Sequence, residues 1–213
     1  LQNRKMAKNR TEKGELMTAK ILVVGHRNPD NDSISAAVGY AHLKNALAAR
    51  DGEAEAVEYV PARLGPLPVE SAWLLERNNI PEPVLIDSVN PVERDGETVV
   101  QKVILVDHNE VAQAAPGIEN AEVVEIIDHH RIADVTTANP ILFLNLPIGS
   151  TATIVTLQFR QTGIDLPDSI AQMLLSAILT DTVIMKSPTC TQVDIDQVKF
   201  LADKLGLDAV EVG

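Results

Sequence analysis

Residues 20–33 read KILVVGHRNPDNDS, and this stretch decides the fold that we expect for the chain. Residues 21–24 form an unbroken run of leucine and β-branched residues, which is typical of a strand buried on both faces. The asparagine-rich acidic loop leads into a helical pattern over residues 32–50, which should end near Gly52. A buried strand followed by a helix predicts the first unit of a parallel sheet.

The rest of the chain repeats this alternation. Short apolar runs predict further strands at residues 56–60, 84–86, 103–106, 123–127 and 141–146. Helical patterns predict helices at residues 69–78, 151–161, 168–182 and 193–204. The segment 88–98 contains NPVERDGE, which favours a turn-rich surface loop. We therefore predict an α/β fold, a Rossmann-like, doubly wound, mainly parallel sheet flanked by helices.

The first residues differ in composition from the others. Residues 1–16 carry five Lys or Arg against two Glu, whereas the whole chain has a formal net charge of −12. They also lack apolar periodicity, so we expect residues 1–18 to be a flexible extension or an added tail, with Met17 as a natural start. Residues 19–207 are expected to form one domain.

Composition limits the classes of function. Apolar residues make up 45% of the chain and aromatic residues only 3%, so the core must consist mainly of Ile, Leu, Val and Ala. The acidic charge argues against unassisted binding to nucleic acid or an anionic membrane, although bound cations would admit an anionic substrate. The single cysteine, Cys190, cannot form an internal disulfide, and no apolar run approaches the ~18 to 20 residues of a membrane span. We therefore expect a cytoplasmic protein.

Acidic residues and histidines follow three of the predicted strands. The strand at 21–24 leads into GHRNPDNDS (25–33), that at 103–106 into DHNE (107–110), and that at 123–127 into DHHR (128–131). Ligands gather beyond the carboxyl ends of parallel strands, so these side chains should share one edge. Clustered carboxylates repel each other, and a bound divalent metal is the economical counter-charge. Taken singly, Asp32 could instead be a helix cap and His26 a satisfied core histidine.

Asp181 is a further candidate. In the helix predicted over 168–182, Ile170, Leu174 and Ile178 form an apolar stripe, and Asp181 falls within it at roughly 100° per residue. An unpaired carboxylate there would have a heavy desolvation cost, so it needs a partner. That partner could be the metal cluster, although a salt bridge or the helix end could also satisfy it.

The first loop carries neither the G-x-G-x-x-G of dinucleotide-binding folds nor the G-K-[ST] of a P-loop. Its acidic side chains would repel phosphate unless metal ions intervened. The sequence therefore predicts a site that binds metal first and an anion second.

Four motifs together resemble those of family II inorganic pyrophosphatases, which belong to the DHH phosphoesterase superfamily. The motifs are GHRNPDND (25–32), VDHNE (106–110), IDHHRI (127–132) and LTDTVIMKSPTCT (179–191). The resemblance extends from Lys20 to the C-terminus. The DHH motif alone would indicate only the superfamily, whereas its combination with VDHNE and KSPTCT indicates the pyrophosphatase branch.

The resemblance implies hydrolysis of pyrophosphate to two phosphates by a hydroxide that two metal ions activate. It implies Mn²⁺ or Co²⁺ at two sites, with an additional Mg²⁺ that arrives with the substrate. The implied metal ligands are His26, Asp30 and Asp107 for one ion, and Asp32, Asp107, His129 and Asp181 for the other. The implied catalytic residues are Asp107, which bridges the ions, His130, which faces the substrate phosphate, and Asp128, which with His108 orients the ligands.

Members of that family carry a second domain whose basic residues bind the phosphates. The resemblance thus implies that residues 208–213 begin a linker to a C-terminal substrate-binding domain. We expect the chain to bind metal, to hydrolyse pyrophosphate weakly or not at all, and to form a homodimer through an edge of this domain. Two alternatives stay open: an exopolyphosphatase or other DHH-type phosphodiesterase, and a non-catalytic metal-binding or dimerisation module.

Overall fold

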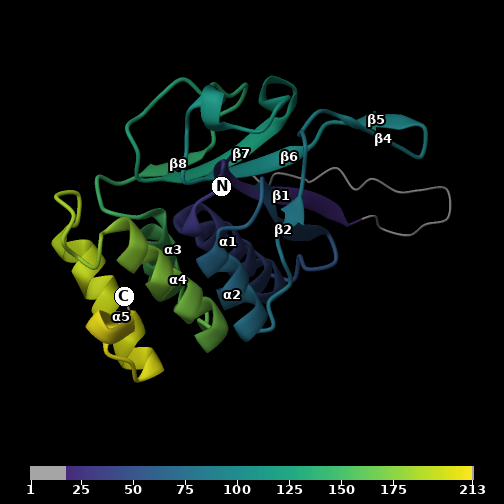
Figure 1. Cartoon of the computed structure of the whole chain (residues 1–213). Coiled ribbons are helices and arrows are strands. Elements are labelled where there is room, and N and C mark those ends of the chain that lie inside the picture. Colours follow the sequence, from purple (N-terminus) through teal and green to yellow (C-terminus); the bar gives the residue numbers. More distant parts are fainter. Residues whose placement is uncertain (1–17, 213) are drawn as a thin grey trace.

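The computed structural model describes residues 18–212, and its centre is a six-stranded sheet in which every pairing is parallel (Figure 1). Its strands are β1 (Ala19–Arg27), β2 (Val57–Leu64), β3 (Val84–Leu85), β6 (Lys102–Val106), β7 (Glu122–Asp128) and β8 (Leu142–Asn145). They lie in the order β3-β2-β1-β6-β7-β8, so the chain moves outward from the centre in both directions. The predicted doubly wound, parallel α/β fold is confirmed.

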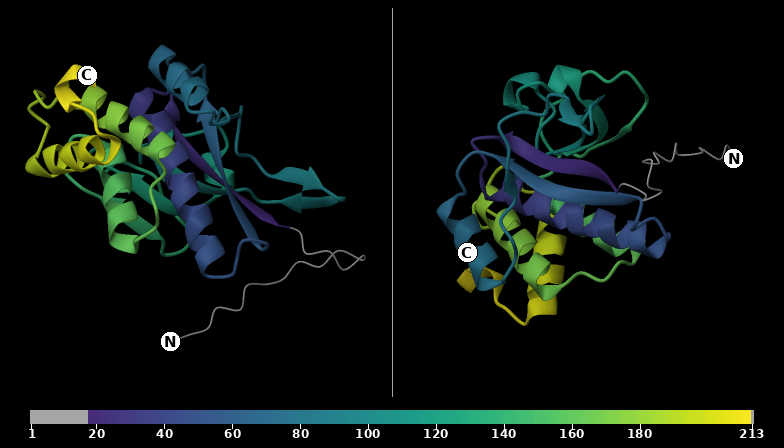
Figure 2. Two further views of the ribbon diagram at one scale, coloured as in Figure 1. Left: turned by 90° about the horizontal axis from the view of Figure 1, so that it is seen from below. Right: turned by 90° about the vertical axis from the view of Figure 1, so that its right-hand side faces the viewer.

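The longer helices of the described chain all lie on one face of this sheet (Figure 2). They are α1 (Asn31–Arg50), α2 (Val69–Arg77), α3 (Thr151–Thr162), α4 (Asp168–Asp181) and α5 (Gln192–Leu205), and a short α6 (Ala209–Val212) follows. The other face is covered by the β6–β7 connection, which contains the 3₁₀ helices η1 (Val111–Gln113) and η2 (Ile118–Asn120). Right-handed crossovers that leave a central point in opposite directions fall on opposite faces, which explains why α1 and α2 lie opposite the β6–β7 connection. Helices α3, α4 and α5 follow β8 and are not crossovers; they pack with α1 in the same hydrophobic core.

Adjacent residues of the central strands enter two different hydrophobic cores. Val23 and Ile104 pack with the helices, whereas Val24 and Leu105 pack under the β6–β7 connection, and all four are fully buried. Because successive side chains of a strand point to opposite faces, burial on both sides requires continuous apolar runs. This is why the strands could be recognised in the sequence.

The prediction of a surface loop over residues 88–98 is wrong in its centre. Strands β4 (Val92–Arg94) and β5 (Glu97–Val99) form an antiparallel hairpin that projects from the sheet (Figure 1). Asp95 and Gly96 both have positive φ, 54° and 82°, as a two-residue type I′ turn requires. Asp-Gly is the sequence most typical of that turn, and this local preference outweighs the general turn signal.

Every other predicted helix and strand is present, with bounds that differ by a few residues at most. The predicted tail lies outside the described residues except for Thr18. None of the helices in the described range is long and apolar enough to cross a membrane.

A buried carboxylate ties the start of α3 to the start of α5. Asp194 is fully buried and accepts hydrogen bonds from the amide nitrogens of Gly149 (2.9 Å) and Thr191 (2.8 Å). It also accepts from the hydroxyls of Thr153 and Thr191, both at 2.7 Å. The bonds to Thr191 form a capping box for α5. Asp194 thereby fixes the turn at residues 149–151, which lies at the carboxyl edge of the sheet.

Replacing Asp194 by Ala should therefore lower the free energy of unfolding by about 2 to 3 kcal/mol, because several donors lose a charged acceptor at once. Asp196→Ala is the matched control, since Asp196 is exposed on the same helix and, among the described residues, accepts a hydrogen bond from Gln192 alone. Its effect should stay within about 0.5 kcal/mol. Urea unfolding of both variants measures this, and equal losses would contradict the role given to Asp194.

Candidate metal centre

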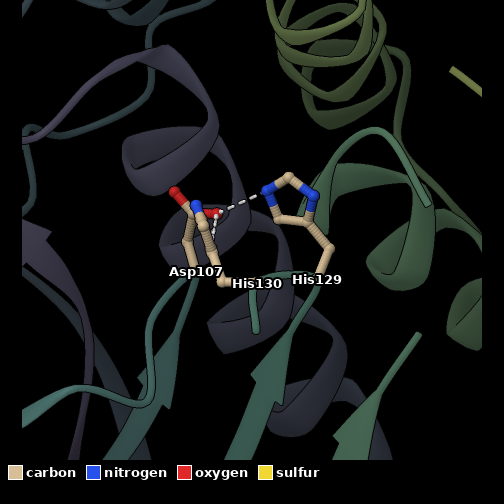
Figure 3. Close-up of side chains that lie close together, drawn as sticks. All are labelled: Asp107, His129 and His130. Atoms are coloured by element: carbon tan, nitrogen blue, oxygen red, sulfur yellow. Dashed lines mark ion pairs between the residues drawn. The ribbon is translucent and has the colours of Figure 1, made fainter. Parts of the chain in front are cut away.

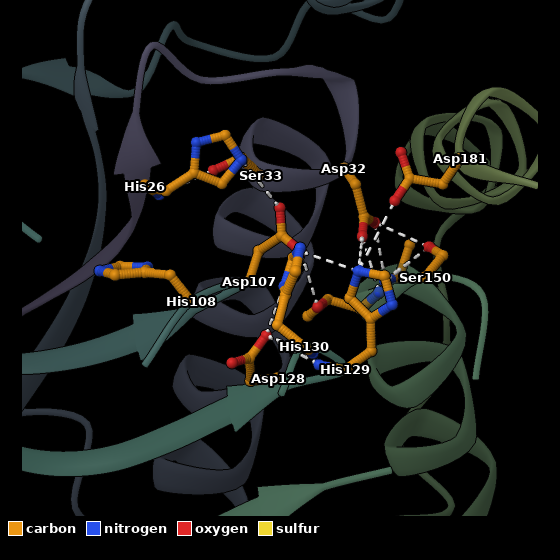
Figure 4. Close-up of polar contacts among 12 residues, drawn as sticks. His26, Asp32, Ser33, Asp107, His108, Asp128, His129, His130, Ser150 and Asp181 are labelled. Carbon is orange, nitrogen blue, oxygen red and sulfur yellow. Dashed lines mark hydrogen bonds and ion pairs between the residues drawn. The ribbon is translucent and has the colours of Figure 1, made fainter. Parts of the chain in front are cut away.

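The structure brings all six predicted ligands together at the carboxyl edge of the sheet, and Figure 4 labels five of them, all except Asp30. They come from the ends of three strands and two helices: His26, Asp30, Asp32, Asp107, His129 and Asp181. The site lies where β1 and β6 adjoin, which is the point from which the chain winds in opposite directions. Crevices at such switch points are the usual ligand sites of open parallel sheets.

Three groups of potential ligand atoms lie at this edge; two contain the six predicted ligands, and the third consists of Asp107, His129 and His130. In the first ligand group, the donor atoms of His26, Asp30 and Asp107 lie within 4.8 Å of one another. In the second ligand group, the same holds for Asp32, His129 and Asp181. The groups adjoin closely enough for one carboxylate to face both.

Asp107 is that carboxylate. It is 1% exposed, and its Oδ2 lies 3.3 Å from His26 Nε2 while its Oδ1 lies 3.4 Å from His129 Nε2 (Figure 3). The hydroxyl of Thr151 donates to Oδ1 at 2.9 Å and fixes the carboxylate plane. The backbone of Asp107 has a φ of 63°, a left-handed conformation that Asp tolerates better than most residues. Such strain is common at functional sites.

The imidazoles are oriented for metal binding. His26 Nδ1 lies 2.8 Å from the carbonyl oxygen of Arg27, and His129 Nδ1 lies 2.9 Å from that of Ile148. A carbonyl can only accept, so each Nδ1 donates and each Nε2 faces the cluster.

Two buried atoms at the centre have no hydrogen-bond partner among the described residues. They are His129 Nε2 and Asp107 Oδ2. Buried polar atoms are nearly always paired, and their ion-pair contacts here are not aligned as hydrogen bonds. A mixed set of imidazole and carboxylate donors with unpaired atoms at its centre fits a bound divalent cation.

Asp32 is held by the N-terminus of α3. Ser150 Oγ and the amide of Ala152 donate to Oδ1, both at 2.8 Å, and the amide of Thr151 donates to Oδ2 at 2.6 Å. Ser150 also caps α3 by accepting from the amide of Ala152 at 3.1 Å. Helix N-termini favour anions, so α3 stabilises the ionised form of this fully buried carboxylate.

The helix-cap interpretation of Asp32 is wrong. The cap of α1 is Asp30, whose side chain accepts from the amide of Ser33 at 2.9 Å. Asp32 lies inside the first turn and points to α3 instead. Asp30 can therefore act as a cap and still present its second oxygen, 3.4 Å from His26 Nε2.

Burial and neighbouring carboxylates raise the pKa of Asp32 and of Asp181, whereas the histidines lower that of Asp107. Burial, with the charges of Asp107 and Asp181, raises the pKa of Asp32 well above its usual value. Burial, with the charges of Asp107 and Asp30, raises the pKa of Asp181 to about 7. Burial also opposes ionisation of Asp107, but its contacts with His129 and His26 prevail and lower its pKa.

The histidines respond in the opposite sense. Burial opposes protonation of His26, yet its contacts with Asp107 and Asp30 raise its pKa to about 11. Burial also opposes protonation of His129, and contact with Asp107 raises its pKa to about 9. Protons on these rings supply counter-charge whenever no cation does.

His130 adjoins the cluster on its outer side. Its side chain is 50% exposed, and its Nδ1 lies 2.9 Å from Asp128 Oδ1 and 3.8 Å from Asp107 Oδ1 (Figure 3). Buried Asp128 also accepts from the amides of His129 and His130. The hydrogen bond to Asp128 raises the pKa of His130. Asp128 thus orients His130 and lies behind the ligand groups.

The structure adds Asn109, which sequence reasoning missed, and His108 lies beside the cluster with its side chain bonded to the main chain (Figure 4). Asn109 donates to Asp128 and to the carbonyl of Arg131 (3.0 Å), and so anchors the segment that carries both histidines. Its only signal was its place within the VDHNE motif. His108 Nδ1 bonds to Val106 O at 2.9 Å, and within residues 18–212 no hydrogen bond of His108 reaches a predicted ligand.

Comparisons with known proteins identify the family of the chain. The family model described as "DHH family, N-terminal domain" matches residues 20–178. A probable manganese-dependent inorganic pyrophosphatase of Brevibacillus brevis is 43% identical over 194 residues, which cover 91% of this chain and 58% of that protein. The manganese-dependent inorganic pyrophosphatase of Methanothrix thermoacetophila is 41% identical over 197 residues, 92% of this chain and 58% of the relative.

A crystal structure of a candidate family II inorganic pyrophosphatase from Methanococcus jannaschii has a similar fold. It superposes with a TM-score of 0.74 at 34% identity, over 90% of this chain and 59% of that one. The chain thus spans less than two thirds of the length of these relatives. The family model covers most of the chain and includes the ligand-bearing ends of β1, β6 and β7. The chain therefore belongs to the DHH family, and residues 20–178 match the N-terminal domain of that family.

Proposed function

We propose that this chain is the metal-binding catalytic domain of a manganese-dependent inorganic pyrophosphatase, which hydrolyses pyrophosphate to two phosphates. The observation that supports this most is the pair of ligand groups with Asp107 between them. The names of relatives that cover nearly the whole chain support the choice of substrate and metal.

We assign two Mn²⁺ ions to the two ligand groups, with Asp107 shared. When bound, such ions neutralise phosphate charge and lower the pKa of a water nucleophile. The chain's own part is to hold the ligands in place: Thr151 orients Asp107, and the N-terminus of α3 orients Asp32. We further propose that the substrate arrives with Mg²⁺.

His130 is proposed to bind the substrate. Its Nδ1 donates to Asp128, which leaves Nε2 of a half-exposed ring to donate to a phosphate oxygen. Because the bond to Asp128 raises the pKa of His130, the ring keeps its positive charge to higher pH than a free histidine. The charge would bind a phosphate oxygen beside the ligand groups.

The site at Asp107 can be tested without relying on turnover. We expect wild type to bind two Mn²⁺ per chain in calorimetric titration, with electron paramagnetic resonance reporting the pair. Replacing a residue that only orients a ligand lowers metal affinity by roughly 10- to 100-fold, and Asp107→Asn should lower the Mn²⁺ affinity by more than that. Asp95→Asn is the matched control, because Asp95 also has positive φ (54°), which Asn tolerates, and lies in the β4–β5 turn.

The same proteins should be assayed for phosphate release from pyrophosphate, tripolyphosphate and a nitrophenyl phosphodiester. Faster release from tripolyphosphate or the diester would favour the other hydrolase activities. Binding of two ions without turnover of any substrate would favour the non-catalytic module. Equal Mn²⁺ binding by the Asp107→Asn and Asp95→Asn variants would refute the proposed site.

Mn²⁺ binding should release protons and strengthen with rising pH. Below their pKa values of about 9 and 11, His129 and His26 each hold a proton that the ion must displace, and Asp181, at about 7, adds a part near neutrality. Each ligand group contains one of these histidines, so between pH 6 and 8 the logarithm of the affinity for each ion should rise by about one per pH unit, and that for the pair by about two. Calorimetry in buffers of different ionisation enthalpy counts the protons, and buffer-independent heats would contradict the ligand assignment.

The proposal also includes a cytoplasmic location and a homodimer. The edge strand β8 exposes Leu142 (50%) and Phe143 (41%), which supports pairing of two copies at this edge. Phe143→Lys should then convert dimer to monomer in sedimentation at micromolar concentration. A wild-type monomer under those conditions would argue against this interface.

A further inference from the structure

A buried asparagine between two of the proposed ligands links three helices. Asn31 is 2% exposed, and its Oδ1 accepts from Ser71 Oγ of α2 at 2.9 Å. Its Nδ2 donates to Ser176 Oγ of α4 at 3.0 Å. We infer that Asn31 is a positioning residue, which holds α1 and α4 at the separation that the second ligand group requires. The inference rests on the proposed metal site.

The hydrogen bonds fix which way the amide faces. Thr180 donates its hydroxyl hydrogen to main-chain carbonyls of its own helix, with Ala177 O at 2.9 Å. Its Oγ1 can therefore only accept, and Asn31 Nδ2 lies 3.4 Å away. The amide nitrogen must face α4, which leaves the oxygen for α2. Neither a carboxylate nor a hydrocarbon of this size could make both contacts.

The position of this clamp ties it to the metal ligands. Asn31 precedes Asp32 on α1, and Thr180 precedes Asp181 on α4, so the contact lies one residue from a ligand on each helix. The donor atoms of Asp32 and Asp181 lie within 4.8 Å of each other, and two carboxylates this close repel when both are ionised. A directional contact between the helices is needed to keep them close.

Apolar packing alone would not fix the relative position of α1 and α4. The α1–α4 contact includes Gly39, where an added Cβ would lie 3.1 Å from Leu174 Cδ2, so the helices pack closely. Apolar contacts are non-directional, whereas a satisfied buried hydrogen-bond network specifies one arrangement. Asn31 supplies that network at the end of α1 where the ligands are.

A purely structural role predicts a different result, and the chain contains a matched control. Asn45 lies on the same helix, donates to Tyr59 O and accepts from Tyr59 N, both at 2.8 Å, and so ties α1 to β2. It is a partly buried amide with no contact to a proposed ligand among its hydrogen bonds. Replacing either asparagine by Leu, a side chain of similar size, removes the amide and both of its hydrogen-bonding functions.

The experiment compares Asn31→Leu with Asn45→Leu in Mn²⁺ titration, paramagnetic resonance and thermal unfolding. We expect Asn31→Leu to weaken the second Mn²⁺ by about 10- to 100-fold and to reduce the two-ion spectrum. Binding of the first ion should change by less than about threefold. Asn45→Leu should lower Tm but leave both affinities at the wild-type values.

Ser176→Ala provides a second variant that adds no bulk, in case Asn31→Leu fails to fold. Ser176→Ala should weaken binding of the second Mn²⁺ alone. The double variant Asn31→Leu, Ser176→Ala should lose less affinity than the sum of the two single losses, because both changes remove the same contact. Wild-type affinities in both single variants, or equal losses in Asn31→Leu and Asn45→Leu, would overturn the inference. Failure of the wild type to bind two ions would instead overturn the proposed function on which the inference rests.

Discussion

The repulsion among carboxylates at the carboxyl edge of the sheet is the constraint on which the rest of the site depends. Asp32 and Asp107 are buried there, and Asp30 and Asp181 lie beside them. Within residues 18–212, the ion pairs that reach these four come from histidines, with no Lys or Arg among them. Such an arrangement persists only if fixed donors and a mobile counter-charge, either protons or metal ions, offset the repulsion.

The fixed donors form a chain that runs from the helical layer to the sheet. Asp194, at the start of α5, holds the turn at residues 149–151. That turn starts α3, whose amides and Ser150 bind Asp32, while Thr151 binds Asp107. Helix α5 contains no predicted ligand, yet Asp194 at its start fixes the turn that positions two of them, Asp32 and Asp107. The geometry is held by several independent bonds, so no single one carries the whole site.

The sequence predicts the sheet and the ligands but not the groups that hold them. Strands such as β6 are recognisable because burial on both faces requires unbroken apolar runs, and strand ends mark the ligand edge. Asn31 and Asp194 gave no such signal, because a polar residue on a helix is by default exposed. Their partners, Ser176 and Gly149, are distant in sequence, and only the folded chain brings them near. The β4–β5 hairpin differs, since Asp95-Gly96 did carry its signal.

The pKa shifts imply that metal binding at the proposed site would be a source of stability that grows with pH. A raised carboxyl pKa, as in Asp181, means that the folded state without a cation loses stability as pH rises from the ordinary value toward about 7. A raised histidine pKa contributes stability below about 6.5, which is lost as pH passes about 9 for His129 and about 11 for His26. Both effects lower the stability of the cation-free folded state as pH rises. Over the pH range in which this happens, Asp181 and the histidines also lose the protons that compete with a cation. A cation bound at the proposed site would therefore replace the protons as the charge that keeps the carboxylates together.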